Sequence, residues 1–247
     1  RQANAEEASF YQKYLTGTMA EPNRVVDQAL WMQCVMSRQE DPEVGRVIEI
    51  VYAALGKARV SKPDKDYQLK KKSRLELNEG LLVTNTIAKV LRMFGMPAPE
   101  MYRGELATGI EFLQTDPPKL RFGTDVLSGV TDKELAFHVA RRMTYFMPPH
   151  LVAILYPRES LEGLYLGAAS VVDPNYQITT RDDVDPTAKQ MLLQAAGETR
   201  GVLEKQLTPE LRQQLTAVMR SLWKRTPVPE LGIWHRAVEL TAIHAGV

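Results

Sequence analysis

The spacing of apolar residues predicts two helices in the first part of the chain. Residues 24–36 carry apolar side chains at helical intervals, and residues 44–55 repeat this pattern along one face. Asp41 and Pro42 precede the second stretch; an aspartate there caps a helix, and a proline fits its first turn. Gly56 follows the stretch and is expected to end the helix.

The middle of the chain changes from a helix to short extended segments. Residues 78–94 have helical spacing and are followed by Gly95, which is expected to stop the helix. Between residues 99 and 123 the apolar runs are short and bounded by Gly or Pro, a pattern typical of strands. Two or three strands of a small sheet are therefore predicted, over 101–103, 109–113 and 119–122.

The rest of the chain returns to helical spacing. Thr131 and Glu134 stand three residues apart before an apolar run, which is the pattern of a capping box. This helix is expected to reach about Phe146, where Pro148 and Pro149 end it. Three further helices are predicted over 186–206, 208–224 and 229–246. The expected fold class is therefore mainly α with a small β-sheet (α+β).

A basic stretch is the best candidate for a domain boundary. It contains Lys70, Lys71, Lys72 and Arg74, the strongest run of like charge in the chain. We interpret it as a solvated linker or helix face. The alternative is a patch that binds anions or nucleic acid, but no aromatic residues alternate with the charges to stack on bases. The predicted organisation is an N-terminal helical segment over 1–60, a basic linker over 61–76 and a domain over 77–247.

The composition is that of a globular protein without a strong overall charge. Hydrophobic residues make up 44% and charged residues 25%, and the formal net charge of +1 gives no general attraction to nucleic acid. No apolar run is long enough to cross a bilayer, so no membrane insertion is expected. The single cysteine, Cys34, stands among apolar residues and is predicted to be buried. We expect a cytoplasmic protein. Because the chain runs from Arg1 to an apolar stretch ending at Val247, we also expect a piece of a longer protein.

Standard catalytic signatures are missing from the sequence. The four histidines are His138, His150, His235 and His244, and no two of them stand four residues apart, so the HExxH zinc motif is absent. A phosphate-binding loop of the Walker type and a GxSxG nucleophile elbow are absent as well. No cofactor is expected.

Three segments between residues 90 and 246 nevertheless carry a recognisable pattern. Residues 120–140 contain a strand, a Gly and a Leu, and a helix start, and they are similar to the segment with the "sDdEL" helix start that precedes the zinc helix of HtpX-like zinc metallopeptidases, which are gluzincins. Residues 90–102 resemble a family helix that ends in "lGlpaPeVy", and residues 234–246 resemble the helix that supplies the third zinc ligand. The segments follow the family's order over about residues 78–247. The resemblance implies a degenerate gluzincin-like scaffold, here preceded by additional helices.

The same resemblance implies that the zinc chemistry is lost. In this alignment Arg141 and Tyr145 occupy the two histidine positions of HExxH, and Arg142 occupies the position of the general base. Glu239 keeps the carboxylate of the third ligand, whereas Ile243 replaces the aspartate that follows it. A guanidinium offers no lone pair to Zn²⁺, and without the metal and the glutamate neither an activated water nor a base remains. We therefore expect no metal, no catalytic residue and no enzyme activity.

The former metal-site positions are also the candidate binding site. His138, Arg141 and Tyr145 lie at i, i+3 and i+7, along one stripe of a helix. Together with Arg142 they would hold an anionic group or contact a partner; the alternative is that they pack or pair structurally. Glu239 is then a relic of the metal site or an ion-pair partner of Arg141. The other histidines and the three tryptophans are interpreted as structural residues, with His150 in a loop or at a helix start.

Three functions of different classes follow. The first is a non-catalytic pseudopeptidase domain that acts as a protein-interaction or scaffold module; domains with this resemblance look like those of large bacterial proteins that also carry helical repeats. The second is a metal-free enzyme, which needs a nucleophile and a base in contact, and the sequence offers no such pair. The third is a sensor that binds a small anion through Arg141, Arg142 and His138. The first is favoured, because a scaffold that outlives its active site keeps its surface interactions, and its partner is expected to be a protein.

Overall fold

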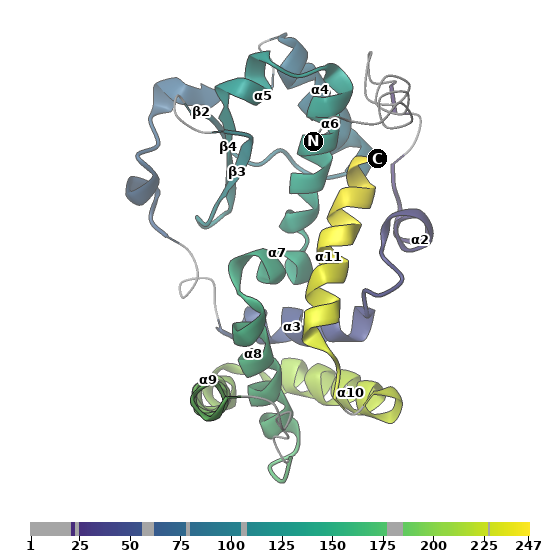
Figure 1. Ribbon diagram of the computed structural model, residues 1–247, viewed down its shortest axis with the longest axis vertical. Helices are drawn as coiled ribbons and strands as arrows, with labels where there is room; N and C mark the ends of the chain where they lie inside the picture. Colours follow the sequence, from purple (N-terminus) through teal and green to yellow (C-terminus); the bar gives the residue numbers. More distant parts are fainter. Residues whose placement is uncertain are drawn as a thin grey trace. The chain divides into compact units, whose positions relative to one another are not determined.

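The computed structural model shows a mainly helical chain with one small mixed sheet, which confirms the predicted α+β class (Figure 1). It describes residues 21–22, 25–55, 62–77, 80–104, 108–176, 185–226 and 228–247. The chain forms two compact units, each assembled from segments that are distant in the sequence. Unit 1 comprises Arg1–Met36, Ser61–Phe146 and Thr241–Val247, and unit 2 comprises Ser37–Val60 and Met147–Leu240. The predicted domain boundaries at residues 61 and 76 stay a prediction.

The sheet of unit 1 has four strands in the order β1-β2-β4-β3. They are β1 (Arg74–Leu75), β2 (Met101–Gly104), β3 (Ile110–Leu113) and β4 (Lys119–Gly123). β2 and β4 run parallel, while β1 pairs antiparallel with β2 and β3 pairs antiparallel with β4. The three predicted strands are confirmed, and β1 is an additional edge strand that the sequence pattern does not predict.

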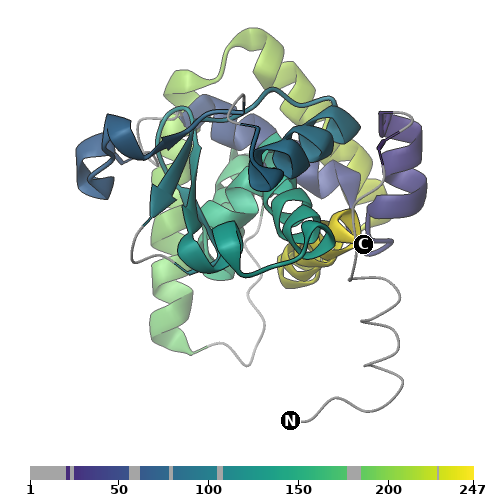
Figure 2. The ribbon, with the colours of Figure 1, turned by 90° about the horizontal axis from the view of Figure 1, so that it is seen from above.

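Two helices of unit 1 pack against each other and beside the sheet (Figure 2). They are α4 (Leu82–Phe94) and α6 (Asp132–Met143), and the short helix α5 (Thr124–Ser128) leads from β4 towards α6. Their shared core joins Val90 of α4, Phe122 of β4 and Val139 of α6, all fully buried. Burying each such side chain contributes roughly 1.5–3 kcal/mol. The core therefore holds α6 firmly within unit 1.

The segment around the 3₁₀ helix η3 (Asp64–Tyr67) is attached to the sheet. The buried ammonium of Lys119 lies 2.6 Å from the Asp64 carboxylate. The backbone N–H of Gln114 donates to the Tyr67 hydroxyl at 3.0 Å. The lysines that follow, around the 3₁₀ helix η4 (Lys71–Ser73), are exposed, as the interpretation of a solvated basic face requires.

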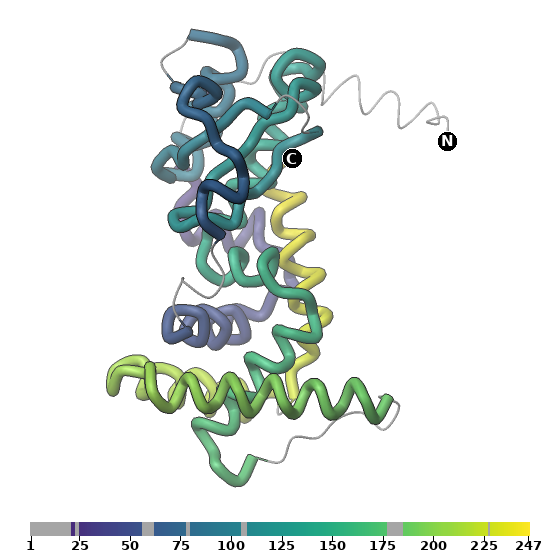
Figure 3. Tube along the Cα trace, turned by 90° about the vertical axis from the view of Figure 1, so that its left-hand side faces the viewer, coloured from purple at the N-terminus to yellow at the C-terminus, as the bar shows by residue number. Residues whose placement is uncertain are grey.

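Unit 2 is built around the helix α3 (Pro42–Leu55), whose buried face includes Val47, Ile48 and Val51. Helices from the second half of the chain surround it: α7 (Pro148–Leu155), α8 (Arg158–Val172), α9 (Pro186–Gln206) and α10 (Pro209–Arg225). The last helix, α11 (Leu231–Gly246), belongs to unit 2 up to Leu240. Figure 3 shows α8 and α9 running across each other, and this is the most extensive helix pair of the unit.

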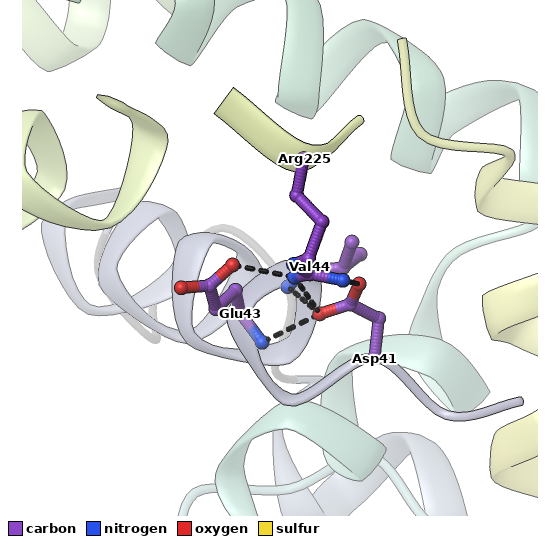
Figure 4. A network of polar contacts seen from close by, with 4 residues as sticks. All are labelled: Asp41, Glu43, Val44 and Arg225. Carbon is purple, nitrogen blue, oxygen red and sulfur yellow. Dashed lines mark hydrogen bonds and ion pairs between the residues drawn. The ribbon is translucent and has the colours of Figure 1, made fainter. Parts of the chain in front are cut away.

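Arg225, in the last turn of α10, joins that helix to the start of α3 (Figure 4). Its guanidinium lies 2.8 Å from the Asp41 carboxylate and 2.5 Å from that of Glu43. Asp41 also caps α3 as predicted, because its Oδ1 accepts the backbone N–H of Glu43 at 2.9 Å and that of Val44 at 3.4 Å. The Asp41 carboxylate therefore both caps the start of α3 and pairs with Arg225 of α10.

The sequence pattern does not predict α7 and α8, where it indicates only the end of the preceding helix. Every residue of α8 from Gly163 to Ser170 is buried. A helix that is covered on all sides has no polar face, so the alternation that normally reveals a helix is missing. The helices predicted at 44–55, 186–206, 208–224 and 229–246 are confirmed within two residues at each end.

The N-terminal prediction needs a correction. The helical part of residues 24–36 is α2 (Gln28–Leu30), which continues into a π-helical turn, η1 (Trp31–Val35). Cys34 is exposed, so the prediction that it is buried is wrong. Its apolar neighbours do not form a buried face, since no residue of α2 or η1 is fully buried. Gly56 lies outside the described residues, and the helix predicted from residue 78 begins only at Leu82, because Leu81 is extended.

Candidate functional site

Contacts at the first turn fix the position of α6. The Thr131 hydroxyl accepts the backbone N–H of Glu134 at 3.2 Å, and the Glu134 carboxylate accepts the N–H of Thr131 at 2.7 Å, which confirms the predicted capping box. Asp132 is buried and accepts a hydrogen bond from the Thr86 hydroxyl of α4. These bonds set the rotation of α6 against α4, and with it the direction of the candidate site residues.

Three residues of the candidate site lie half-buried on α6: His138, Arg141 and Arg142. Burial lowers the pKa of His138 below its usual value, and the charge of Arg141 adds to this effect. Burial likewise lowers the pKa of Arg142. Neither guanidinium forms an ion pair within the described residues of unit 1, and there the buried Nε of Arg141 has no hydrogen-bond partner. This stretch of α6 therefore gathers positive charge in a partly desolvated position.

Tyr145 lies beyond the end of α6. The α-helix ends at Met143, and the chain continues in a 3₁₀ turn, η5 (Thr144–Phe146). Side chains four residues apart share a face only while the α-helix continues, and a 3₁₀ turn changes their rotation. Tyr145 is buried, with 5% of its surface exposed, and it is near enough to Arg142 to raise the pKa of that guanidinium against the effect of burial. The structure therefore places Tyr145 in the interior of unit 1.

Glu239, which the sequence resemblance aligns with a third zinc ligand, lies on α11 and is exposed. It belongs to unit 2, whereas Arg141 belongs to unit 1. Ile243 is a half-buried apolar residue of unit 1, and its side chain has no atom that could bind a metal. The predicted ion pair between Arg141 and Glu239 stays a prediction.

The other histidines form structural contacts. His150 stands in the first turn of α7, as predicted for a helix start, and its Nε2 lies 2.6 Å from Oε1 of Glu40, with both side chains buried. His235 and His244 each place a ring nitrogen against a backbone carbonyl oxygen, at 2.9 and 3.0 Å. Each of these contacts joins two segments that are distant in the sequence, so the three rings have structural roles.

Within the described ranges, no group of three or more His, Cys, Asp or Glu side chains is placed to hold a metal ion. The expectation that no metal binds nevertheless stays a prediction. The helices of the described segments also include none that is long and apolar enough to cross a bilayer.

Sequence reasoning missed a pocket in unit 2. It has a volume of about 560 Å³ and lies between the start of α8, the first half of α9 and residues 228–231. Most of its lining is apolar and includes Leu166, Met191 and Leu192. Two residues of the lining, Met191 and Val228, are 67% and 54% exposed. Large apolar side chains that stay exposed on α9 were the available signal for this pocket, but only the fold brings its lining together.

Comparisons of the chain with protein-family models, curated proteins and solved structures found no match.

Proposed function

We propose that the chain is a non-catalytic domain on a gluzincin-like scaffold, similar to an HtpX-like peptidase that has lost its zinc, and that it acts as a protein-interaction module. The proposal places it in the cytoplasm, within a larger multidomain protein. The partner is a protein, and neither a metal nor a cofactor takes part.

The order of elements in unit 1 supports the scaffold. The resemblance implies a helix, then a strand that leads into a glycine, and then a capped helix at the former zinc site. Here α4 is followed by a left-handed Gly95 with φ 60°, β4 ends at Gly123, and the capping box of Thr131 and Glu134 opens α6. This order of elements along the chain supports the proposed scaffold.

The proposed loss of catalysis rests on the side chains at the former ligand positions. Arg141 and Arg142 present guanidinium groups, which have no lone pair for a metal and cannot act as a base. Tyr145 is buried in the turn after the helix, so it does not stand on the α-helical face that a second ligand requires. A zinc-activated water needs both ligands and a base, and these residues provide neither.

A peptidase assay on the purified chain tests this proposal. We expect no cleavage of an unfolded casein substrate, because the base and the metal ligands of the peptidase are replaced. Cleavage that a strong metal chelator abolishes would contradict the proposal. Cleavage that survives the chelator and is lost in Arg142→Ala would favour a metal-free enzyme instead.

The two guanidiniums of α6 support a second candidate function, a sensor for a small anion. Among the described residues of unit 1 Arg141 and Arg142 lack an ion pair, and a phosphate or carboxylate offers the paired acceptors that such donors bind. Calorimetric titration with inorganic phosphate tests this function. Binding that is lost in Arg141→Ala and kept in Lys70→Ala favours the sensor, and the absence of binding at millimolar phosphate removes it.

A further inference from the structure

The pocket of unit 2 combines an apolar lining with an acidic rim. Arg158, the basic residue of the lining, is already engaged, because its Nε lies 2.9 Å from the Glu162 carboxylate. It also covers Gly232, where a Cβ would come within 2.9 Å of the same Nε. Glu159 and Glu230 are exposed at the rim, and neither takes part in an ion pair with another described residue. The rim therefore carries two carboxylates that an occupant of opposite charge would neutralise.

Close packing of α8 on α9 forms one wall of this pocket. A Cβ at Gly163 would lie 2.9 Å from the Cβ of Ala195, and a Cβ at Gly167 would lie 2.6 Å from the Cβ of Thr199. Ala195 itself lines the pocket. Since the two helices already touch at these small residues, the wall exists before an occupant arrives. A preformed wall reduces the ordering cost of binding.

We propose that this pocket is the docking site for a basic amphipathic helix of a partner protein. The inference rests on the proposed function of an interaction module. A volume of about 560 Å³ accommodates apolar side chains from successive turns of one helix, which project from the same face at i and i+3 or i+4. Lysine or arginine residues beside them would meet Glu159 and Glu230 at the rim. The flexible side chain of Met191 at the edge adapts readily to such a surface.

The rim charges argue against other occupants. An acidic helix would place like charges next to Glu159 and Glu230, which costs binding energy. A purely apolar molecule would fill the lining but leave both carboxylates without a counter-charge. The basic amphipathic helix is the occupant that satisfies both parts of the pocket.

Fluorescence anisotropy with two labelled helical peptides of equal length tests the proposal. One consists of Leu and Lys with the leucines on a single face, and the other has Glu in place of each Lys. We expect the wild-type chain to bind the Leu/Lys peptide more tightly by about tenfold or more, with an advantage that falls as salt is raised. Met191→Gln should weaken this binding about five- to tenfold. Leu193→Gln is the matched control, because Leu193 is an exposed apolar residue of the same helix that does not line the pocket.

The double variant Glu159→Gln/Glu230→Gln should remove the preference for lysine, while Glu198→Gln on the outer side of α9 should keep it. Thermal unfolding of each variant checks that it is folded. The docking site is wrong if the wild-type chain binds neither peptide or both equally, or if Leu193→Gln weakens binding as much as Met191→Gln. Mass spectrometry of the recovered peptide reports separately on the proposed function. A cleaved peptide overturns the non-catalytic assignment, whereas an intact peptide without pocket-dependent binding overturns the docking site alone.

Discussion

At the scale of single residues, we expect the buried pair of His150 and Glu40 to contribute to the stability of unit 2. The two side chains are 2% and 7% exposed, and the contact between them is 2.6 Å long. It links α7 to Glu40, which directly precedes Asp41, the residue that caps α3. His150→Ala takes the imidazole away from a buried carboxylate and leaves a space in the core. We expect a loss of about 2–4 kcal/mol in the free energy of unfolding.

Urea unfolding followed by circular dichroism measures this loss. Lys70→Ala, on the exposed basic face, is the control and should change the free energy of unfolding by less than about 0.5 kcal/mol. If both variants unfold at the same urea concentration, the pair does not hold unit 2 together as described.

Residues whose partners are close in the sequence were predictable, and those with distant partners were not. The cap of Asp41 and the capping box of Thr131 involve residues two or three positions away, so the local sequence specifies them. The burial of His150 depends on Glu40, 110 positions earlier. Cys34 is exposed because no distant segment among the described residues packs over it. The residues next to His150 and Cys34 in the sequence predict neither of these facts.

At the scale of secondary-structure elements, the contact between α8 and α9 depends on small residues. Gly167→Ala would bring a Cβ within 2.6 Å of the Thr199 Cβ and 2.8 Å of the Ala196 carbonyl oxygen. Because the helices must separate to make room, we expect a loss of about 1–3 kcal/mol in the free energy of unfolding. Urea unfolding measures it.

Two glycines of the same helix pair provide the control. Gly197 and Gly201 of α9 have nothing within 4 Å of an added Cβ. Alanine at either position should therefore stabilise the chain by about 0.4–1 kcal/mol, because it restricts the unfolded state and favours the helix. A neutral Gly167→Ala variant would mean that the two helices are not in close contact.

The ion pairs between α10 and α3 make stability depend on pH. Burial acts to raise the pKa of Asp41, but hydrogen bonds from Arg225 and from the backbone N–H groups of Glu43 and Val44 hold it below its usual value. Hydrogen bonds with Ser221 and Arg225 lower the pKa of Glu43. A carboxyl group whose pKa is lowered by folding stabilises the folded state above its unfolded pKa, near 4, and this stabilisation is lost as the pH falls through the folded pKa.

Arg225→Ala should therefore lower the melting temperature at neutral pH, and its difference from the wild type should shrink below about pH 4. Circular dichroism melting curves across this range measure the difference. Lys224→Ala, at the neighbouring exposed position, should show no such dependence. A difference for Arg225→Ala that stays constant with pH would show that the contact in Figure 4 does not form in solution.

At the scale of the whole molecule, the division into units follows contacts that periodicity does not contain. The sequence specifies most helices and the three main strands, because apolar spacing, caps and glycines are local signals. Unit 2 instead combines α3, from the first quarter of the chain, with helices that begin after Met147. The pocket likewise needs α8, α9 and residues 228–231 together, so no single stretch of sequence reveals it.

The zinc content of the purified wild-type chain tests the central claim most directly. Elemental analysis after dialysis against a weak chelator should find no stoichiometric zinc, because the proposed alignment puts Arg141, Arg142 and Tyr145 at the ligand and base positions of the peptidase motif. One zinc per chain, retained through the dialysis and lost in Glu239→Ala, would contradict the account, since it would mean that a metal site remains where we infer that it has been lost.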